Sequence, residues 1–178
     1  MGTRLAIIIM TLFASLSSSF ASLNAVPVGY KQVAAQYNIP AEILYAIALT
    51  ESGTKLRQGI RPWPWTINVA GKGYRYPTQK DACIALTGFM RSTRLKRIDV
   101  GLGQTNLGYN GHHYQSSCEG FSPYKNLHVT AKILNECYQS QGRGSWLNAA
   151  ACYHRPAGGR PAQTYRLAVQ RHLKTVTQ

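Results

Sequence analysis

The chain has 178 residues, a length typical of one domain that can bury its own core without metal ions or disulfides. Its 20 Lys and Arg against 6 Asp and Glu give a formal net charge of +14, which makes a polyanion the expected partner. The basic residues are dispersed along the chain, so part of this excess is expected on solvated surface.

The first 25 residues have the pattern of an export signal. Arg4 supplies a positive charge, the apolar stretch LAIIIMTLFASL follows, and the small residues of SSSFASLNA offer cleavage after Ala21 or Ala25. The apolar run is shorter than the ~20 residues that span a bilayer, which disfavours a membrane anchor. We therefore expect a mature domain over residues 26–178, exported to the periplasm and without a membrane span.

Export changes what the charge and the cysteines indicate. Outside the cytoplasm the expected polyanion is wall or membrane material, and nucleic acid is not expected. An oxidising compartment favours disulfides among Cys83, Cys118, Cys137 and Cys152. Four cysteines allow three pairings, and the sequence does not choose among them.

Apolar residues at helical spacing predict helices over residues 28–36, 40–52, 78–90 and 126–138, with a last helix over 164–174. Between Glu51 and Thr78 the sequence is dense in Pro, Gly and aromatic residues, which predicts a structured loop or a small hairpin with TINV and YRY as strand pieces. A glycine-rich loop, DVGLGQTNLGYNGHHY, separates the third and fourth helices. The fold class is therefore mainly α.

Only six carboxylates are present, so each can be considered in turn. Five have local structural explanations, such as a place in the first turn of a helix or in a turn. Glu51 has none, because it follows the apolar run AEILYAIALT at the point where Ser52 and Gly53 end the helix. A carboxyl there loses solvation, its pKa should rise, and it becomes a candidate general acid. A cap or a salt bridge at the helix end is the alternative explanation.

The stretch RPWPWTIN holds Trp63, Trp65 and Asn68 in a loop framed by prolines. Flat aromatic faces and amides suit a sugar-binding groove, although a tryptophan can equally fill a core. The prolines and the lack of helical spacing favour the groove.

Four blocks stand in order along the chain: ALTESG at 48–53, DVGLGQTN at 99–106, SPYKNL at 122–127 and AACYHRPA at 150–157. They resemble the signature blocks of the soluble lytic transglycosylases of the lysozyme superfamily. The segment RPWPWTINVAGKGYRYP is similar to the subgroup associated with conjugative elements, type IV secretion and pilus systems. This resemblance implies a lysozyme-like domain of the goose type over residues 26–178, with a small irregular or hairpin insertion.

The resemblance also assigns roles. It implies that Glu51 is the catalytic acid, that Ser52 contacts the substrate or orients the acid, and that Gln104 lies at the sugar groove. It places Tyr153 near the acid and gives Asn126 a structural role. The chain departs from the family pattern at Gly103, where methionine is usual, and at His154, where asparagine is commoner, although the conjugation-associated subgroup also looks like Tyr-His there.

The implied reaction needs no metal or other cofactor. Glu51 protonates the oxygen of the β-1,4 bond between N-acetylmuramic acid and N-acetylglucosamine, and the muramoyl C6 hydroxyl closes on C1 to give a 1,6-anhydro product. The expected partner is peptidoglycan, with components of a secretion, conjugation or pilus apparatus as further partners.

Three alternatives stay open. A hydrolytic muramidase would use Asp99 to position water. A non-enzymatic module would bind wall or DNA through its charge and would use Glu51 only structurally. A metal site formed by His112, His113 and Cys118 is disfavoured, because the spacing matches no standard zinc pattern.

Overall fold

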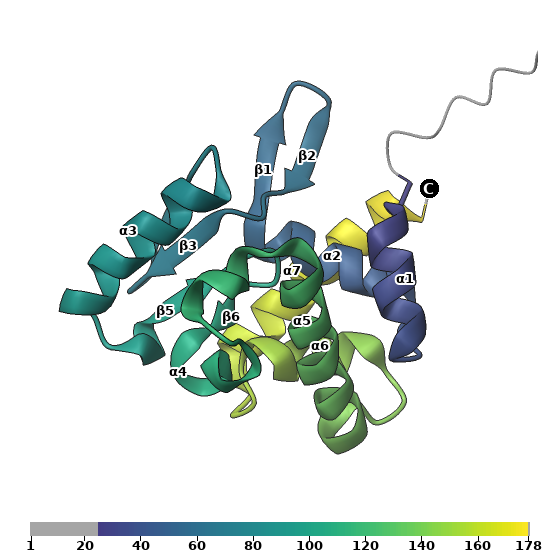
Figure 1. The fold of residues 1–178 in the computed structure, drawn as a ribbon. Coiled ribbons are helices and arrows are strands. Elements are labelled where there is room, and N and C mark those ends of the chain that lie inside the picture. The colour runs from purple at the N-terminus through teal and green to yellow at the C-terminus, as the bar shows by residue number, and fades with distance from the viewer. Residues whose placement is uncertain (1–24, 178) are drawn as a thin grey trace, which may run out of the picture.

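The computed structural model describes residues 25–177, so the expected export signal lies outside the described residues except for Ala25. Figure 1 shows a mainly helical molecule with small antiparallel sheets on one side. Its α-helices are α1 (Val28–Gln36), α2 (Ala41–Ser52), α3 (Gln79–Ser92), α4 (Leu107–Asn110), α5 (Pro123–Cys137), α6 (Trp146–His154) and α7 (Gly159–Val176). Among the described residues none of these helices is long and apolar enough to cross a membrane.

The helices expected from periodicity are present, and their ends follow local capping. The side chain of Thr78 accepts a hydrogen bond from the Asp81 backbone N–H at 3.1 Å, which starts α3 as the spacing of the two residues predicted. Helix α5 begins at Pro123, three residues before the expected start, since proline suits a first helical position. Helix α7 begins at Gly159, five residues before its expected start.

Helix α6 was not expected from the sequence. It has nine residues, and its N-cap is Ser145, whose hydroxyl accepts a hydrogen bond from the Asn148 N–H at 3.4 Å. Its composition is rich in alanine, which favours helix but gives a weak apolar periodicity. Because the helix is short and lies between two glycine-rich segments, its sequence resembles a loop.

The region between α2 and α3 forms two hairpins instead of one. Strand β1 (Gly53–Leu56) pairs with β2 (Gly59–Pro62) in a hairpin that projects from the body (Figure 1). Strand β3 (Thr66–Val69) pairs with β4 (Lys72–Arg75) on one edge and with β5 (Ile98–Val100) on the other. Strand β6 (Thr105–Asn106) adds to β5, so part of the expected glycine-rich loop belongs to a four-stranded sheet.

Two hydrophobic cores divide the molecule into two lobes. The helical lobe is built around α2, most of which is buried, with α1, α6 and α7 packed against it and α5 packed against α1 and α6. The sheet lobe is built around buried residues of β3, β5 and α3, among them Ile67, Leu86 and Ile98. Helix α5 contributes to both cores through Leu127 and Val129.

Each lobe carries one disulfide. Cys137 pairs with Cys152 and joins the end of α5 to α6, whereas Cys83 pairs with Cys118 and joins α3 to the segment before α5. Disulfides fit an exported protein.

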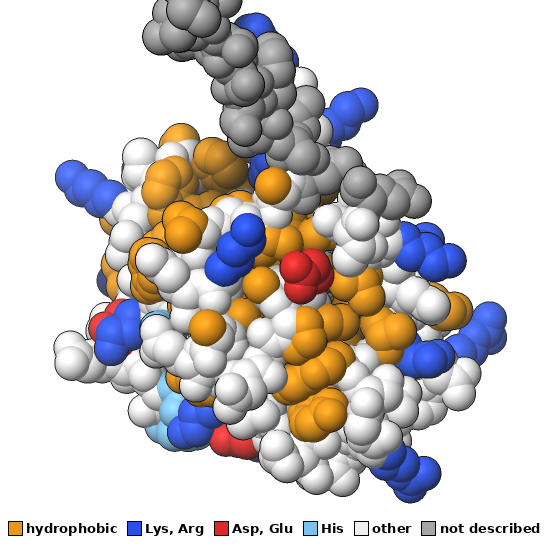
Figure 2. Space-filling model, turned by 90° about the vertical axis from the view of Figure 1, so that its right-hand side faces the viewer, with side chains coloured by type: hydrophobic (Ala, Val, Ile, Leu, Met, Phe, Trp, Pro, Cys, Tyr) orange, Lys and Arg blue, Asp and Glu red, His pale blue; other side chains and the backbone are white. Residues whose placement is uncertain are grey.

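Figure 2 shows the face on the α1 side, where hydrophobic side chains gather around one carboxylate while Lys and Arg side chains project from the edges. The positive charge of this face thus lies mainly along its edges.

Candidate active site

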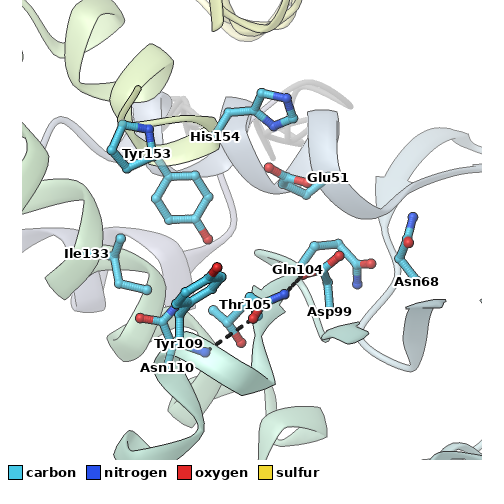
Figure 3. Close-up of a pocket in the computed structure, with 12 residues that line it drawn as sticks. Glu51, Asn68, Asp99, Gln104, Thr105, Tyr109, Asn110, Ile133, Tyr153 and His154 are labelled. Atoms are coloured by element: carbon cyan, nitrogen blue, oxygen red, sulfur yellow. Dashed lines mark hydrogen bonds between the residues drawn. The ribbon is translucent and has the colours of Figure 1, made fainter. Parts of the chain in front are cut away.

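A cleft of about 650 Å³ lies between the two lobes and receives side chains from both (Figure 3). The helical lobe contributes Glu51 from the end of α2, Ile133 from α5, and Tyr153 and His154 from α6. The opposite wall consists of polar groups from the sheet and the segment after it: Asn68, Asp99, Gln104, Thr105, Asn106, Tyr109 and Asn110. A cleft of this size with converging polar groups is the usual form of a binding site.

The environment of Glu51 favours the protonated carboxyl. Burial raises its pKa from 4.5 to about 8, because the residues before it on α2 form the most buried helix of the molecule. Tyr165 opposes the shift by favouring the carboxylate, and the negative charge of Asp99 adds to it. The carboxyl is nevertheless only partly buried and opens to the cleft, so at neutral pH Glu51 can donate a proton to a bound ligand.

Tyr165 is a site residue that sequence reasoning missed. It lies on α7 in a buried row with Ala162 and Val169, which in the sequence looks like an ordinary core face. Its hydroxyl is buried and interacts with the Glu51 carboxyl, while its ring stacks on His154 with centroids 4.4 Å apart. Burial and the charge of Glu51 raise the pKa of Tyr165, so the hydroxyl keeps its proton and can orient the carboxyl.

Tyr153 lines the cleft near Glu51, the place that the family resemblance implied for it. Burial raises its pKa, with a further contribution from the charge of Glu51. Its hydroxyl donates a 2.6 Å hydrogen bond to the Gly103 carbonyl, so it joins α6 to the loop that carries Gln104. Cys152, the residue directly before Tyr153, is bonded to Cys137, and this disulfide restrains that part of α6.

The wall opposite Glu51 is a row of three polar side chains across the sheet. Asn68 on β3 lies opposite Asp99 on β5, and Asp99 lies opposite Asn106 on β6, so all three share one face. The Asn106 amide donates to the Asp99 carboxylate at 2.8 Å. Burial raises the pKa of Asp99, and the Asn106 hydrogen bond opposes that shift. The cleft therefore holds a second carboxyl, near Glu51 but in a more polar environment.

The loop of residues 101–104 packs so closely on α5 that two of its residues must be glycine. A Cβ on Gly101, whose φ is +81°, would collide with the Asn126 amide and the Gly120 carbonyl. One on Gly103 would collide with the Thr130 hydroxyl. A side chain at residue 103 would thus point into α5 and not into the cleft, which explains the absence of methionine there.

Gln104 follows this loop and lines the cleft as expected. Its side-chain amide donates to the carbonyls of Thr66 and Gly101 at 3.1 and 2.8 Å, so its oxygen faces the cleft without a partner among the described residues. Asn68 also lines the cleft, and its side-chain oxygen accepts from the Gly71 N–H at 2.9 Å.

Three residues expected to bind substrate lie elsewhere. Ser52 is fully buried, and its hydroxyl bonds the carbonyls of Ala48 and Leu102, so of its two expected roles it fits the orienting one. Trp63 donates to the Tyr76 carbonyl at 2.7 Å and contacts Trp65 edge to face, while Trp65 packs against the core of the sheet lobe. Neither tryptophan lines the cleft, because the Trp63 ring is held at the Tyr76 carbonyl and the Trp65 ring packs on the core of the sheet lobe.

The residues of the alternative metal site have other contacts. His112 and His113 pack against each other with ring centroids 4.0 Å apart, and Cys118 is in a disulfide. Within residues 25–177 no three His, Cys, Asp or Glu side chains are grouped so that they could hold a metal ion.

Comparison with known proteins gives no match: no protein-family model, no curated protein and no solved structure is significantly similar to this chain.

Proposed function

We propose that the protein is a lytic transglycosylase that is exported and cleaves peptidoglycan in the periplasm. The observation that carries this proposal is the partly buried carboxyl of Glu51, whose pKa of about 8 keeps it protonated at neutral pH at the edge of a polar cleft. The four sequence blocks support a lysozyme-like fold with Glu51 at its centre. The mainly helical architecture and the position of the cleft between two lobes are consistent with that fold.

In the proposed reaction Glu51 acts twice. Its proton goes to the oxygen that links C1 of N-acetylmuramic acid to the next N-acetylglucosamine, and the bond from C1 to that oxygen breaks. The C6 hydroxyl of the same muramoyl residue then bonds to C1, and its proton returns to the Glu51 carboxylate. Because the attacking hydroxyl belongs to the substrate, proximity replaces a second catalytic group. Tyr165 and Tyr153, whose hydroxyls stay protonated, would hold Glu51 and the loop of residues 101–104 in place.

The polymer proposed as substrate agrees with the charge of the protein. Stem peptides of peptidoglycan carry free carboxylates, and the dispersed Lys and Arg side chains attract such a polymer at low salt. A small enzyme of this kind opens the wall locally, and the similarity of residues 61–77 to the conjugation-associated subgroup favours service to a secretion, conjugation or pilus apparatus.

Hydrolysis is a second candidate, favoured by the position of Asp99 in the same cleft as Glu51. A glycosidase with two carboxyls uses one as acid and the other as base or nucleophile. In such an enzyme Asp99 would activate water, and the product would carry a reducing end. The hydrogen bond from Asn106 would favour the ionised form of Asp99 that this role needs, against the burial that raises its pKa.

Digestion of purified peptidoglycan, followed by mass spectrometry of the muropeptides, tests both candidates. A transglycosylase gives products one water lighter than hydrolysis products, and Glu51→Gln lowers the rate by more than about a thousand-fold. Asp99→Asn leaves the product unchanged if the reaction is non-hydrolytic. Reducing-end products that depend on Asp99 would establish hydrolysis, and cleavage that survives in Glu51→Gln would exclude Glu51 as the acid. If the wild type cleaves no peptidoglycan, the remaining alternative is a non-enzymatic basic binding module.

The pH profile gives an independent test of the acid. Activity should fall as the pH rises through about 8, because the ionised carboxylate has no proton to give. A rate that increases steadily up to pH 10 would be incompatible with a protonated Glu51 as the acid.

A further inference from the structure

A second cavity, of about 420 Å³, lies between α6 and α7 on a different side of α6 from the catalytic cleft. Its α6 wall is formed by Asn148, Ala151 and Cys152, which share one face of that helix, and by Arg155, which directly follows the helix. Tyr153 and His154, which line the catalytic cleft, lie on the other sides of the helix. The two cavities are thus separate, and nothing bound in one would occupy the other.

Two arginines line this cavity without a counter-ion. No carboxylate is among the residues that line it, and within residues 25–177 neither the Arg155 nor the Arg166 side chain has an ion pair or a hydrogen bond. The Nε of Arg166 is buried and lacks a partner. A buried donor of this kind costs free energy until an acceptor reaches it, so the cavity is suited to an anion.

The start of α7 reinforces this preference. The cavity includes Gly158 and Gly159, where α7 begins, and that helix has neither a side-chain N-cap nor an acidic residue in its first turn. The positive end of the helix dipole is therefore uncompensated by the protein's own side chains, and an anion in the cavity would benefit from it.

The rest of the lining indicates which anion fits. The side chains of Gln141, Asn148 and Gln163 supply amides, and Ala151 and Ala162 supply methyl surfaces. Amides pair with peptide groups, methyl surfaces pack against small side chains, and guanidinium groups pair with a carboxylate. A bare phosphate would leave the methyl surfaces of Ala151 and Ala162 without a partner.

We propose that this cavity binds the free carboxylate end of a short peptide, with Arg155 and Arg166 pairing with the carboxylate. The natural ligand would be a stem peptide of the wall, an assignment that rests on the proposed function. The enzyme would then hold its polymer at two points, the glycan in the cleft and a peptide behind α6.

The test uses wild-type mature protein, D-Ala-D-Ala as the probe and the C-terminal amide of the same dipeptide as its control. In ¹H–¹⁵N spectra the dipeptide should shift the amide signals of Gly158, Gly159 and Ala162 and leave those of Gln104 and Tyr153 unchanged. The amide form should bind at least about ten-fold more weakly, because it lacks the charge that the arginines pair with.

Variants sharpen the result. Arg155→Gln and Arg166→Gln should each weaken dipeptide binding by about ten-fold, whereas Arg171→Gln, an exposed arginine of α7 outside the cavity, should leave it unchanged. Equal binding of the carboxylate and amide forms, shifts confined to the catalytic cleft, or displacement of the dipeptide by an equal concentration of inorganic phosphate would each overturn the proposal. If the variants do not fold, the comparison of the two peptide forms on the wild type still decides.

The outcome is separable from that of the proposed function. Dipeptide binding involves no glycan cleavage, so a protein that binds the dipeptide but cleaves no peptidoglycan would retain this site and lose the proposed activity. The reverse result would retain the activity and remove the site.

Discussion

The two lobes face each other across the cleft with different chemistry. The helical lobe places Glu51 at the end of a buried apolar helix, beside two tyrosines whose hydroxyls stay protonated. The sheet lobe offers a row of polar side chains, Asn68, Asp99 and Asn106, set by cross-strand pairing. The apolar lobe thus sets the pKa of the acid, and the polar lobe provides contacts for a hydrophilic ligand. A catalytic cleft needs both.

The buried side chain of Asn126 links the two lobes. Asn126 on α5 is fully buried, accepts from the Gly103 N–H at 2.8 Å and donates to groups of the sheet lobe. Its amide lies within hydrogen-bonding distance of Val100 O, Thr105 Oγ1, Tyr114 Oη and Gly120 O. This side chain therefore fixes the loop before Gln104 relative to both cores.

Removing this link should produce the largest loss of stability. Asn126→Ala leaves several buried polar groups without partners, so we expect the free energy of unfolding to fall by about 3–5 kcal/mol, measured by urea denaturation. Asn135→Ala, on the same helix but without a side-chain hydrogen bond among the described residues, is the matched control and should cost less than about 1 kcal/mol. Equal losses in both variants would mean that Asn126 does not join the lobes.

The two disulfides allow the lobes to be weakened separately. Cys137 and Cys152 are 15 residues apart in the sequence, and replacing both by serine should lower the free energy of unfolding by about 3 kcal/mol. Replacing both Cys83 and Cys118, which are 35 residues apart, should lower it somewhat more, because the disulfide closes a longer loop. Activity should respond differently, because Cys152 directly precedes Tyr153 and the other pair lies away from Glu51. We expect peptidoglycan cleavage to fall several-fold more in the first double variant than in the second. The opposite order would place the sensitive part of the site in the sheet lobe.

The acid itself should reduce the stability of the helical lobe at high pH. The folded state holds the Glu51 proton up to about pH 8, whereas an unfolded glutamate releases it near pH 4.5, so stability falls as the pH rises between these values. Glu51→Gln removes this loss and should raise the free energy of unfolding by about 3 kcal/mol at pH 8.5 and by little at pH 4.5. Urea denaturation at the two pH values measures this change in the free energy of unfolding. Glu136→Gln, at an exposed position of α5, is the control. A variant that is less stable than the wild type at pH 8.5 would contradict the raised pKa.

The sequence predicted continuous apolar helices better than short paired strands and contacts between distant segments, and the reason is physical. Helix α2 is a nearly continuous apolar run that follows Pro40 and ends at Ser52 before Gly53, so its bounds and the isolation of Glu51 at its end follow from local pattern. Strands β5 and β6 have three and two residues, too few to show alternation, so the row that contains Asp99 appears only once the sheet is paired. Tyr165 reaches Glu51 from a helix more than a hundred residues later, a contact that no local pattern encodes. Trp63 and Trp65 were misplaced because prolines fix a loop's shape without revealing which way its rings turn.

The smallest expected effects come from two glycines, one packed against α5 and one exposed on α3, for which the same substitution should have opposite effects on stability. Gly103→Ala puts a methyl group against Thr130 of α5 and should destabilise the protein by about 1–3 kcal/mol, and Thr130→Ala should restore part of that loss in the double variant. Gly88→Ala, on α3 of the sheet lobe, meets nothing within 4 Å and should stabilise by about 0.5–1 kcal/mol, because alanine favours a helix over glycine. Thermal unfolding of the four variants measures both signs. If Gly103→Ala were neutral, the loop would be free to move away from α5, and the position of Gln104 in the cleft would no longer depend on that helix.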